Sequence, residues 1–381
     1  MHSFRAQHLP ALDGLRGLAI LLVITHHQLL PLSLKGGFLG VDLFFVLSGF
    51  LITRLLLQEF EATRSISLTK FYARRVLRLA PALLLYLIAS LVITYLLHPE
   101  EFGHEIKLVG LALAYLTNWR MALGWDYWLD STSIIWSLSI EEQFYLLWPP
   151  LLLLALSARI RPGHLKVALT LIVVGIGLHR GVLWSQGVDL NRMYYGTDTR
   201  VDAPLMGCLI ALLSAIQLKS RTRALLNIGA FASVGCLVWL IVTSTFTDSF
   251  LYRGGYTIVA IAAGVLTWSV ADSSESIIGR ALSWYPLRWF GFISYGLYLW
   301  HWLILRHVSL YGIVGDWDTW AKFVSAVLVA AASYYLIERR FTKLKTRFGS
   351  AREISMKPSF TVGLLSREPT PSLVQTSDQQ L

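Results

Sequence analysis

Residues 12–27 read LDGLRGLAILLVITHH, an apolar stretch that carries an arginine, Arg16, and ends on a histidine, His27. A helix turns by about 100° per residue, so a step of eleven residues returns to nearly the same face, about 16 Å further along the axis. A charged side chain at membrane depth costs about 2.5–3.5 kcal/mol on insertion scales, and such residues usually line a cavity or a substrate path. The stretch therefore predicts a membrane helix that carries a functional site.

The composition places the whole chain in a membrane. Its 381 residues are 55% hydrophobic and 15% charged, with a mean hydropathy of +0.56, which is more apolar than a soluble domain. The Lys and Arg residues that give the net charge of +10 lie between apolar stretches. We therefore interpret them as loop residues that face an anionic inner leaflet, and we expect no nucleic-acid partner. Cys208 and Cys236 share no metal-ligand spacing with histidine, so neither a disulfide nor a metal site is expected.

Hydropathy predicts an all-α, polytopic transmembrane bundle of about ten spans. A transmembrane domain over residues 1–345 would be followed by a disordered cytoplasmic tail over 346–381, which is rich in Ser, Thr, Pro and Gln. A further apolar piece over 106–116 is too short to span comfortably. The predicted spans are residues 12–31, 39–57, 79–97, 134–156, 165–184, 203–217, 225–245, 254–271, 287–306 and 320–337.

Charge predicts the orientation of the bundle. With ten spans, most of the 33 Lys and Arg residues fall on the side that holds both termini. An eleventh crossing over 106–116 would send three basic loops and the basic tail outside, against the positive-inside tendency. The N-terminus lacks a small-residue cleavage site after its apolar run, so we keep it as the first span. Both termini are predicted to be cytoplasmic, and the protein is predicted to be a multi-pass protein of the bacterial plasma membrane.

This topology predicts a chamber that opens outward. His27, Asp42 and His301 would lie in the outer half of the membrane with Glu141 and Glu142, and Arg16 would form a cationic throat near the inner face. Histidine is suited to take a proton from a hydroxyl near neutral pH, and Asp42 could orient it. His26 points about 80° away and is a weaker candidate.

The sequence leaves two questions about these residues open. His301 lies between Trp300 and Trp302, so an aromatic-belt role competes almost equally with a catalytic one. Glu141 and Glu142 are adjacent and differ by about 100° on a helix, so one would face the cavity and the other a neighbouring helix.

Arginines precede the third predicted span. Arg74, Arg75 and Arg78 sit where a cytosolic, phosphate-rich ligand would meet the membrane, and Arg75 and Arg78 share a helical face. An ordinary positive-inside anchor is the competing interpretation, and charge alone favours it. The direct continuity of the cluster with a span favours a phosphate site.

Together these segments resemble the integral-membrane acyltransferase-3 family, whose members O-acylate surface sugars, lipid-linked glycans and some antibiotics. The resemblance extends from residue 12 to about residue 340. The matching segments, in the family's order, are Leu12-Asp13-Gly14-Leu15-Arg16 leading to His27, residues 37–50 (GFLGVDLFFVLSGF), residues 74–78 (RRVLR), residues 136–145 (WSLSIEEQFY, with Trp136) and residues 294–302 (SYGLYLWHW, with Ser294 and Tyr295).

The resemblance implies ten helices, an acyl-coenzyme A donor entering from the cytoplasm at Arg74, Arg75 and Arg78, and essential roles for Arg16 and His27. We assign Asp42 and Glu142 to the same catalytic set, and keep Glu141, Trp136, Ser294, Tyr295 and His301 as further candidates. No hydrolase-like domain follows the tenth predicted helix, so the stand-alone form of the family is expected.

The expected reaction is O-acylation, with acetyl-coenzyme A the first candidate donor and no permanently bound cofactor. His27 would deprotonate a hydroxyl that attacks the thioester, or would carry the acyl group transiently. The acceptor could be a glycan, a lipid-linked sugar or a glycosylated small molecule. A secondary transporter or an acyl-group exporter would also place ionisable residues on several helices at one depth, but no inverted repeat is visible.

Overall fold

The computed structural model describes residues 9–27, 29–30, 34–125, 130–215, 218–307 and 316–344, and these ranges hold helices and turns with no strand. The predicted tail over 346–381 lies outside them. A helix stands at each of the ten predicted spans. They are α1 (Pro10–His26), α2 (Gly40–Thr63), α3 (Leu68–Leu97), α6 (Trp136–Ser157), α7 (Pro162–Ser185), α10 (Asp202–Ser214), α11 (Ser220–Thr243), α12 (Tyr256–Asp272), α14 (Tyr285–His307) and α15 (Asp316–Ser333).

Six helical stretches within the described ranges are long and apolar enough to cross a membrane: Lys35–Thr63, Leu68–Leu97, Pro162–Ser185, Ser220–Thr243, Leu251–Asp272 and Trp317–Leu344. Two of them contain adjoining short elements, η1 (Lys35–Leu39) before α2 and η4 (Leu251–Gly255) before α12. The last runs through η5 (Tyr334–Glu338) and α16 (Arg339–Leu344). The all-α class is thereby confirmed for the described residues, and six of the ten predicted spans coincide with candidate membrane-spanning helices.

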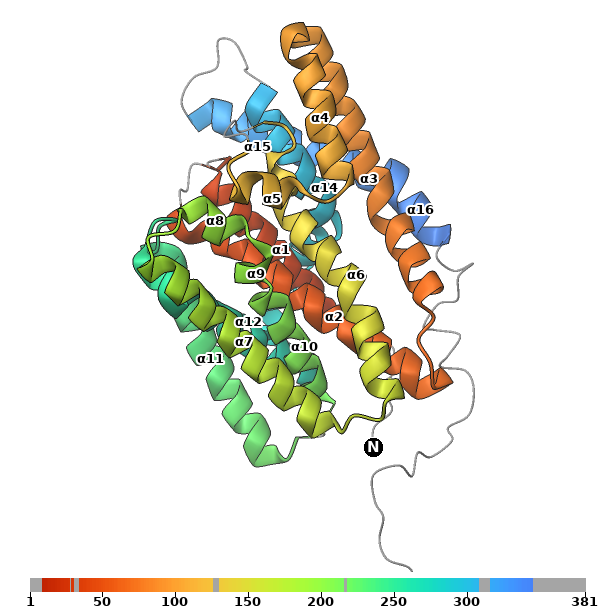
Figure 1. The fold of residues 1–381 in the computed structure, drawn as a ribbon, viewed down its shortest axis with the longest axis vertical. Coiled ribbons are helices and arrows are strands. Elements are labelled where there is room, and N and C mark those ends of the chain that lie inside the picture. The colour runs from red at the N-terminus through yellow and green to blue at the C-terminus, as the bar shows by residue number, and fades with distance from the viewer. Residues whose placement is uncertain are drawn as a thin grey trace, which may run out of the picture.

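Short elements connect the long helices. They are η2 (Pro99–Glu101), α4 (Phe102–Leu113), α5 (Thr117–Ala122), η3 (Ser133–Ile135), α8 (Leu190–Tyr195), α9 (Thr197–Arg200) and α13 (Ile277–Leu282). The apolar piece over 106–116 falls mostly in α4, which runs back along the upper half of α3 (Figure 1).

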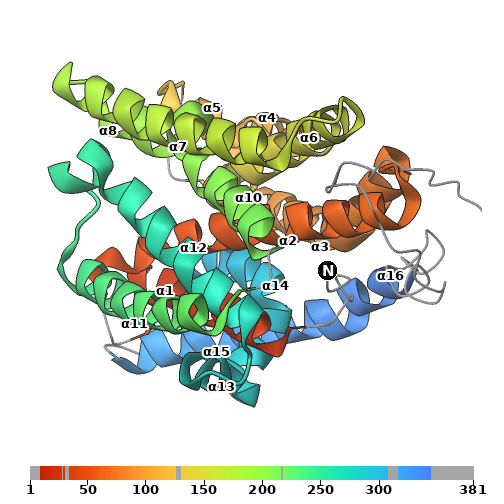
Figure 2. The ribbon, with the colours of Figure 1, turned by 90° about the horizontal axis from the view of Figure 1, so that it is seen from below.

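The long helices pack in layers. Seen from below, α2 and α10 lie between a layer that contains α6 and α7 and a layer that contains α1, α14 and α15 (Figure 2). α2 therefore faces both layers, and residues from α1, α3, α6 and α14 can meet against it. The candidate site forms at this junction.

Helices α1 and α14 make an unusually close contact, because glycines face the neighbouring backbone. A Cβ atom added at Gly17 would lie 1.9 Å from the carbonyl oxygen of Leu287 in α14, and one added at Gly14 would lie 1.6 Å from that of Leu282, the last residue of α13. A Cβ at Gly291 would lie 1.9 Å from the carbonyl oxygen of Asp13. Small residues permit this approach of two backbones in a membrane protein.

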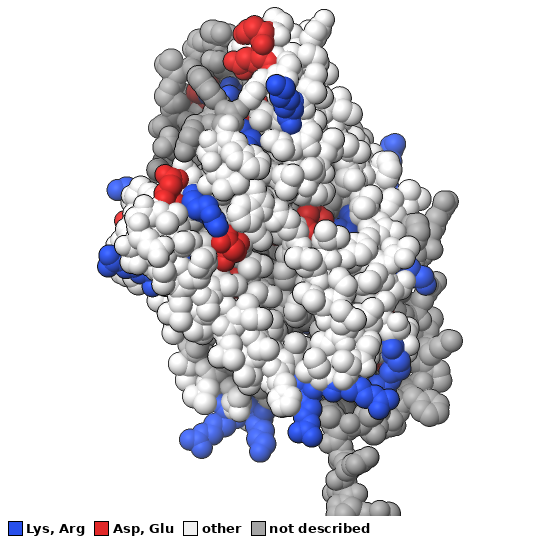
Figure 3. All heavy atoms as spheres, in the orientation of Figure 1, with Lys and Arg blue, Asp and Glu red and all other residues white. Residues whose placement is uncertain are grey.

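Basic side chains gather along the lower edge of the molecule in Figure 3, where Figure 1 places the turn between α6 and α7 and the start of α11. These segments contain Arg159, Arg161, Lys219, Arg221 and Arg223. The sides of the bundle between this edge and the upper end are mostly uncharged in the same view. This pattern is typical of a membrane protein whose basic end faces the cytoplasm.

Candidate active site

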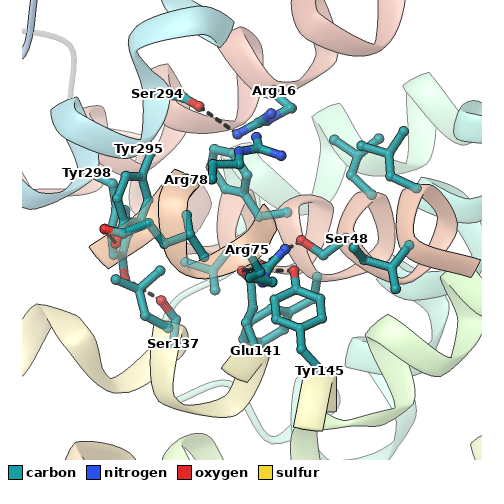
Figure 4. A pocket seen from close by; sticks show the side chains of 18 residues that line it. Arg16, Ser48, Arg75, Arg78, Ser137, Glu141, Tyr145, Ser294, Tyr295 and Tyr298 are labelled. Carbon is teal, nitrogen blue, oxygen red and sulfur yellow. Dashed lines mark hydrogen bonds and ion pairs between the residues drawn. The ribbon is translucent and has the colours of Figure 1, made fainter. Parts of the chain in front are cut away.

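A pocket opens between α1, α2, α3, α6 and α14, and its polar side chains are drawn in Figure 4. Arginines outnumber acids in its lining, so the pocket favours an anion. Its residues are Arg16, Val41, Phe44, Phe45, Leu47, Ser48, Leu51, Ile52, Arg75, Arg78, Leu79, Ser137, Leu138, Glu141, Tyr145, Ser294, Tyr295 and Tyr298.

Arg16 and Arg78 lie side by side on one wall of this pocket (Figure 4). The Nη2 group of Arg16 donates a hydrogen bond to Ser294 Oγ at 3.3 Å. Arg78 makes no hydrogen bond or ion pair within the part of the chain that the structure describes. Glu338 interacts electrostatically with both guanidinium groups, while its carboxylate accepts a hydrogen bond from Ser333 Oγ at 3.2 Å. Two adjacent guanidinium groups without an ion-paired carboxylate among the described residues have the chemistry to hold phosphate oxygens.

Arg75 has the opposite environment, although it lines the same pocket. Its Nε donates to Glu142 Oε1 at 3.1 Å, and its Nη2 lies 3.9 Å from Glu141 Oε2. Its guanidinium also stacks on the Tyr145 ring, with Cζ 3.2 Å from the centroid. Ser48 Oγ donates to Glu141 Oε1 at 2.8 Å. The charge of Arg75 is therefore neutralised within the protein.

Arg74 and the two adjacent glutamates, Glu141 and Glu142, differ in whether they line the pocket. Arg74 is not part of the pocket lining, because its Nη2 pairs with Glu59 Oε2 at 3.2 Å. Glu141 faces the pocket, whereas Glu142 does not line it. Of the two acids, the structure thus gives the cavity position to Glu141, while our sequence-based set placed Glu142 among the catalytic residues.

Two tyrosines of α14 form one wall of the pocket, and the second of them contacts His301. Tyr295 donates its hydroxyl hydrogen to the carbonyl oxygen of Leu79 at 3.1 Å. The Tyr298 hydroxyl lies 2.6 Å from Ser137 Oγ and 2.9 Å from the carbonyl oxygen of Ile134. Trp136 does not line the pocket, since its ring is buried against Phe45 and neighbouring tyrosines.

His27 lies in the turn that follows α1, one residue beyond the last residue of the helix. Its Nδ1 is 3.0 Å from Nε2 of His301, and the two rings are stacked with centroids 5.1 Å apart. His27 is not among the pocket-lining residues. Tyr298 links the two places, because it lines the pocket while its ring packs 5.9 Å from the His301 ring.

Asp42 does not orient His27, contrary to the sequence-based expectation. Both of its carboxylate oxygens accept hydrogen bonds from Arg200 Nη2 at 3.0 Å. The partner of Asp42 is instead Arg200, 158 positions along the chain, which the helical phase of nearby residues does not reveal. The side chain within hydrogen-bond distance of His27 is His301 instead.

Two buried ion pairs were not predicted from the sequence. Arg180 donates to both carboxylate oxygens of Asp202, at 3.2 and 3.0 Å. Arg120 pairs with Asp130 at 2.6 Å. Arg180 falls within a predicted span, so an ionisable residue at membrane depth was the available signal. No group of three or more candidate metal ligands occurs among the residues that the structure describes.

Comparison with known proteins agrees with the sequence motifs. A family profile described as an acyltransferase domain matches residues 9–339. The peptidoglycan O-acetyltransferase OatA of Listeria monocytogenes is 36% identical over 361 residues, which cover 90% of this chain and 56% of the relative. The O-acetyltransferase OatA of Staphylococcus aureus is 34% identical over 354 residues, covering 89% of this chain and 58% of the relative.

This chain therefore spans little more than half the length of these curated relatives. No solved structure matches it. Since the family profile extends over most of the chain, from the first described helix to the start of α16, the match includes every residue of the pocket and both histidines. The chain belongs to the integral-membrane acyltransferase-3 family.

Proposed function

We propose that this protein is a multi-pass O-acetyltransferase of the bacterial plasma membrane, which moves an acetyl group from cytoplasmic acetyl-coenzyme A to a hydroxyl of a cell-wall glycan. The observation that carries the proposal is the pair of guanidinium groups, Arg16 and Arg78, in a pocket below His27, which lies in the turn that follows the helix of Arg16. The names of the relatives indicate peptidoglycan as the first acceptor to test.

The proposed topology has ten crossings, with both ends of the chain in the cytoplasm. The basic lower edge in Figure 3 supports this orientation, because positively charged segments remain on the cytoplasmic side. α1 begins near that edge and ends toward the upper end (Figure 1). Arg16 would then lie toward the cytoplasm and His27 toward the outside.

The donor's phosphates would bind at Arg16 and Arg78. A guanidinium group holds phosphate oxygens through two parallel N–H donors, and within the described ranges neither of these two groups has an ion-paired carboxylate. Arg75 and Arg74 are paired with glutamates, so we assign them to holding α3 against α6 and α2 rather than to the donor. Ser294 would fix the orientation of Arg16.

The thioester would reach the level of His27 through the wall formed by Tyr298 and Ser137. His27 lies eleven positions after Arg16 along α1 and its final turn, a rise of about 16 Å. The flexible arm of the donor would extend along this path. The wall would have to open during the cycle, because hydrogen bonds of the Tyr298 hydroxyl close it in this structure.

His27 would act as the general base. Its free ring nitrogen takes the proton of the acceptor hydroxyl while the oxygen attacks the thioester carbonyl. The tetrahedral intermediate then expels the coenzyme thiolate, which recovers that proton from the imidazolium. The products are the acetyl ester and free coenzyme A. An acyl-histidine intermediate remains the alternative, and trapping acetyl on His27 would favour it.

The test is transfer by the full chain in proteoliposomes. Protein reconstituted with acetyl-labelled coenzyme A inside and a peptidoglycan glycan fragment outside should yield labelled acetyl ester on the fragment. His27→Ala should abolish transfer without changing the melting temperature. Release of label outside without esterification would instead indicate an exporter, and full transfer by His27→Ala would refute the proposed chemistry.

A further inference from the structure

We propose that His301 is a positioning residue that holds His27 in the one tautomer able to accept a proton. The inference rests on the proposed function, because it assumes that His27 acts as the base. It assigns a role to a second histidine, 274 positions further along the chain, which the sequence pattern left undecided between a membrane belt and catalysis.

The two rings differ in their access to substrate. The His301 residue is 0% exposed, so it cannot meet a substrate or solvent directly. His27 is half-buried and lies in the turn after α1. Of the two rings, only His27 is therefore accessible to a substrate, and His301 lies on its buried side.

A backbone carbonyl determines where the protons of the pair lie. Nδ1 of His301 is 2.9 Å from the carbonyl oxygen of Leu297, and a carbonyl only accepts, so this nitrogen carries a hydrogen. In the neutral ring Nε2 of His301 is then a lone-pair acceptor. Nδ1 of His27, at 3.0 Å, must supply the hydrogen between the rings. Nε2 of His27 is left with its lone pair free.

This assignment matches the need of the reaction. A base must present an unprotonated nitrogen to the acceptor hydroxyl, and only one ring nitrogen of neutral histidine is available. When Nε2 of His27 gains a proton, the hydrogen bond from its Nδ1 to His301 becomes charge-assisted and stronger. His301 thus orients the ring before the reaction and stabilises the imidazolium during it, as the third group of a catalytic triad does.

Neighbouring groups reinforce the arrangement. Trp302 packs on His27 with centroids 5.2 Å apart, and its Nε1 donates to the carbonyl oxygen of Asp130 at 2.9 Å. The titratable rings that pack on the pair are His26 on His27, at 5.3 Å, and Tyr298 on His301, at 5.9 Å. His26 has its own partner, the carbonyl oxygen of Lys35 at 3.2 Å from its Nδ1.

Two amide substitutions separate the two hydrogen bonds of His301. In His301→Asn the amide occupies the place of Nδ1, so the bond to Leu297 can persist while His27 loses its acceptor. In His301→Gln the amide reaches the place of Nε2, so its oxygen can accept from His27 Nδ1. These variants have similar polarity and form a matched pair.

The experiment measures initial rates of acetyl transfer by the reconstituted full chain, with H27A assayed in parallel. We expect H301N to lower kcat about 100-fold with the donor KM changed by less than about twofold. We expect H301Q to keep kcat within about tenfold of the wild type, because it restores the acceptor. The melting temperature of each variant in detergent reports whether the fold is intact.

Each outcome distinguishes the inference from the proposed function. Equal kcat values for H301N and wild type, with H27A inactive, would overturn the role of His301 and leave the base assignment in place. Full transfer by H27A would overturn both. If H301N does not fold, H301Q decides: a kcat near the wild type supports the inference, and a loss as complete as that of H27A overturns it.

Discussion

Arg200 and Arg78 are both arginines within the helical bundle, but the protein treats their charges in opposite ways. Arg200 is 1% exposed, donates to both oxygens of Asp42 and stacks on the ring of Tyr256, with its Cζ 4.0 Å from the centroid. Arg78 faces a pocket beside Arg16 and has no ion-paired carboxylate among the described residues. A buried cation with a matched acid maintains the fold, whereas a cation left unmatched in a cavity is available for an anionic ligand.

The largest effect should come from breaking the matched pair. Replacing Asp42 by Asn leaves the Arg200 charge buried and unpaired, which should cost about 3–5 kcal/mol of stability. Thermal unfolding of the purified protein in detergent measures this loss. The double variant D42L/R200M should recover most of it, because two apolar side chains need no partner. An unchanged melting temperature for D42N would show that the pair is not structural.

Replacing Arg78 by Gln should affect binding instead of stability. Loss of one guanidinium should weaken acetyl-coenzyme A binding about 10- to 100-fold, since charge-assisted hydrogen bonds to phosphate are lost. The melting temperature should stay the same or rise, because the repulsion from Arg16 is removed. Calorimetric titration with coenzyme A measures the affinity. A large fall in stability without a change in affinity would contradict the proposed donor site.

Arg75 should behave as an intermediate case. Replacing it by Gln leaves Glu141 and Glu142 without their cation and removes the stacking on Tyr145. We expect a loss of about 1–3 kcal/mol in thermal unfolding, from partly buried polar groups that lose a partner. The double variant R75Q/E142Q should lose less than R75Q alone. If instead the stability loss of the double variant equals the sum of the losses of R75Q and E142Q, Arg75 and Glu142 do not act as a pair.

Arg74 should give the smallest effect and serves as the control for Arg78. Its pairing with Glu59 lies nearer the surface, with the arginine side chain 19% exposed. Arg74→Gln should therefore cost less than about 1 kcal/mol and leave the affinity for coenzyme A unchanged. Calorimetry run beside R78Q makes the comparison. An affinity loss equal to that of R78Q would return Arg74 to the donor site.

Local patterns in the sequence predicted much of the fold and part of this site. Apolar runs located ten helices, and the helical phase of Arg16 and His27 placed both on α1 or its final turn. The basic motif predicted the position of the pocket. It did not predict which arginine lacks an ion-paired carboxylate, because Glu59 and Glu142, which pair with Arg74 and Arg75, come from other helices. Helical phase gives the direction of a side chain but not the neighbour that it meets.

The partners that sequence reasoning missed are distant in the chain. Asp42 meets Arg200 across 158 positions, and His27 meets His301 across 274. Each pairing depends on how two helices pack, which no local periodicity encodes. Tyr298 and Ser137 were contained in the matched motifs, yet only the packing of α14 against the start of α6 reveals that they form a wall.

The glycine contacts between α1 and α14 have a consequence for motion. With backbone carbonyls so close to Gly17 and Gly291, neither helix can slide or roll on the other without a clash. The Arg16–Ser294 contact and the His27–His301 contact thus belong to one rigid pair of helices, and the distance between the two contacts is fixed. We therefore expect the movement that admits or releases a ligand to occur in α2, α3 or α6, the other helices that line the pocket.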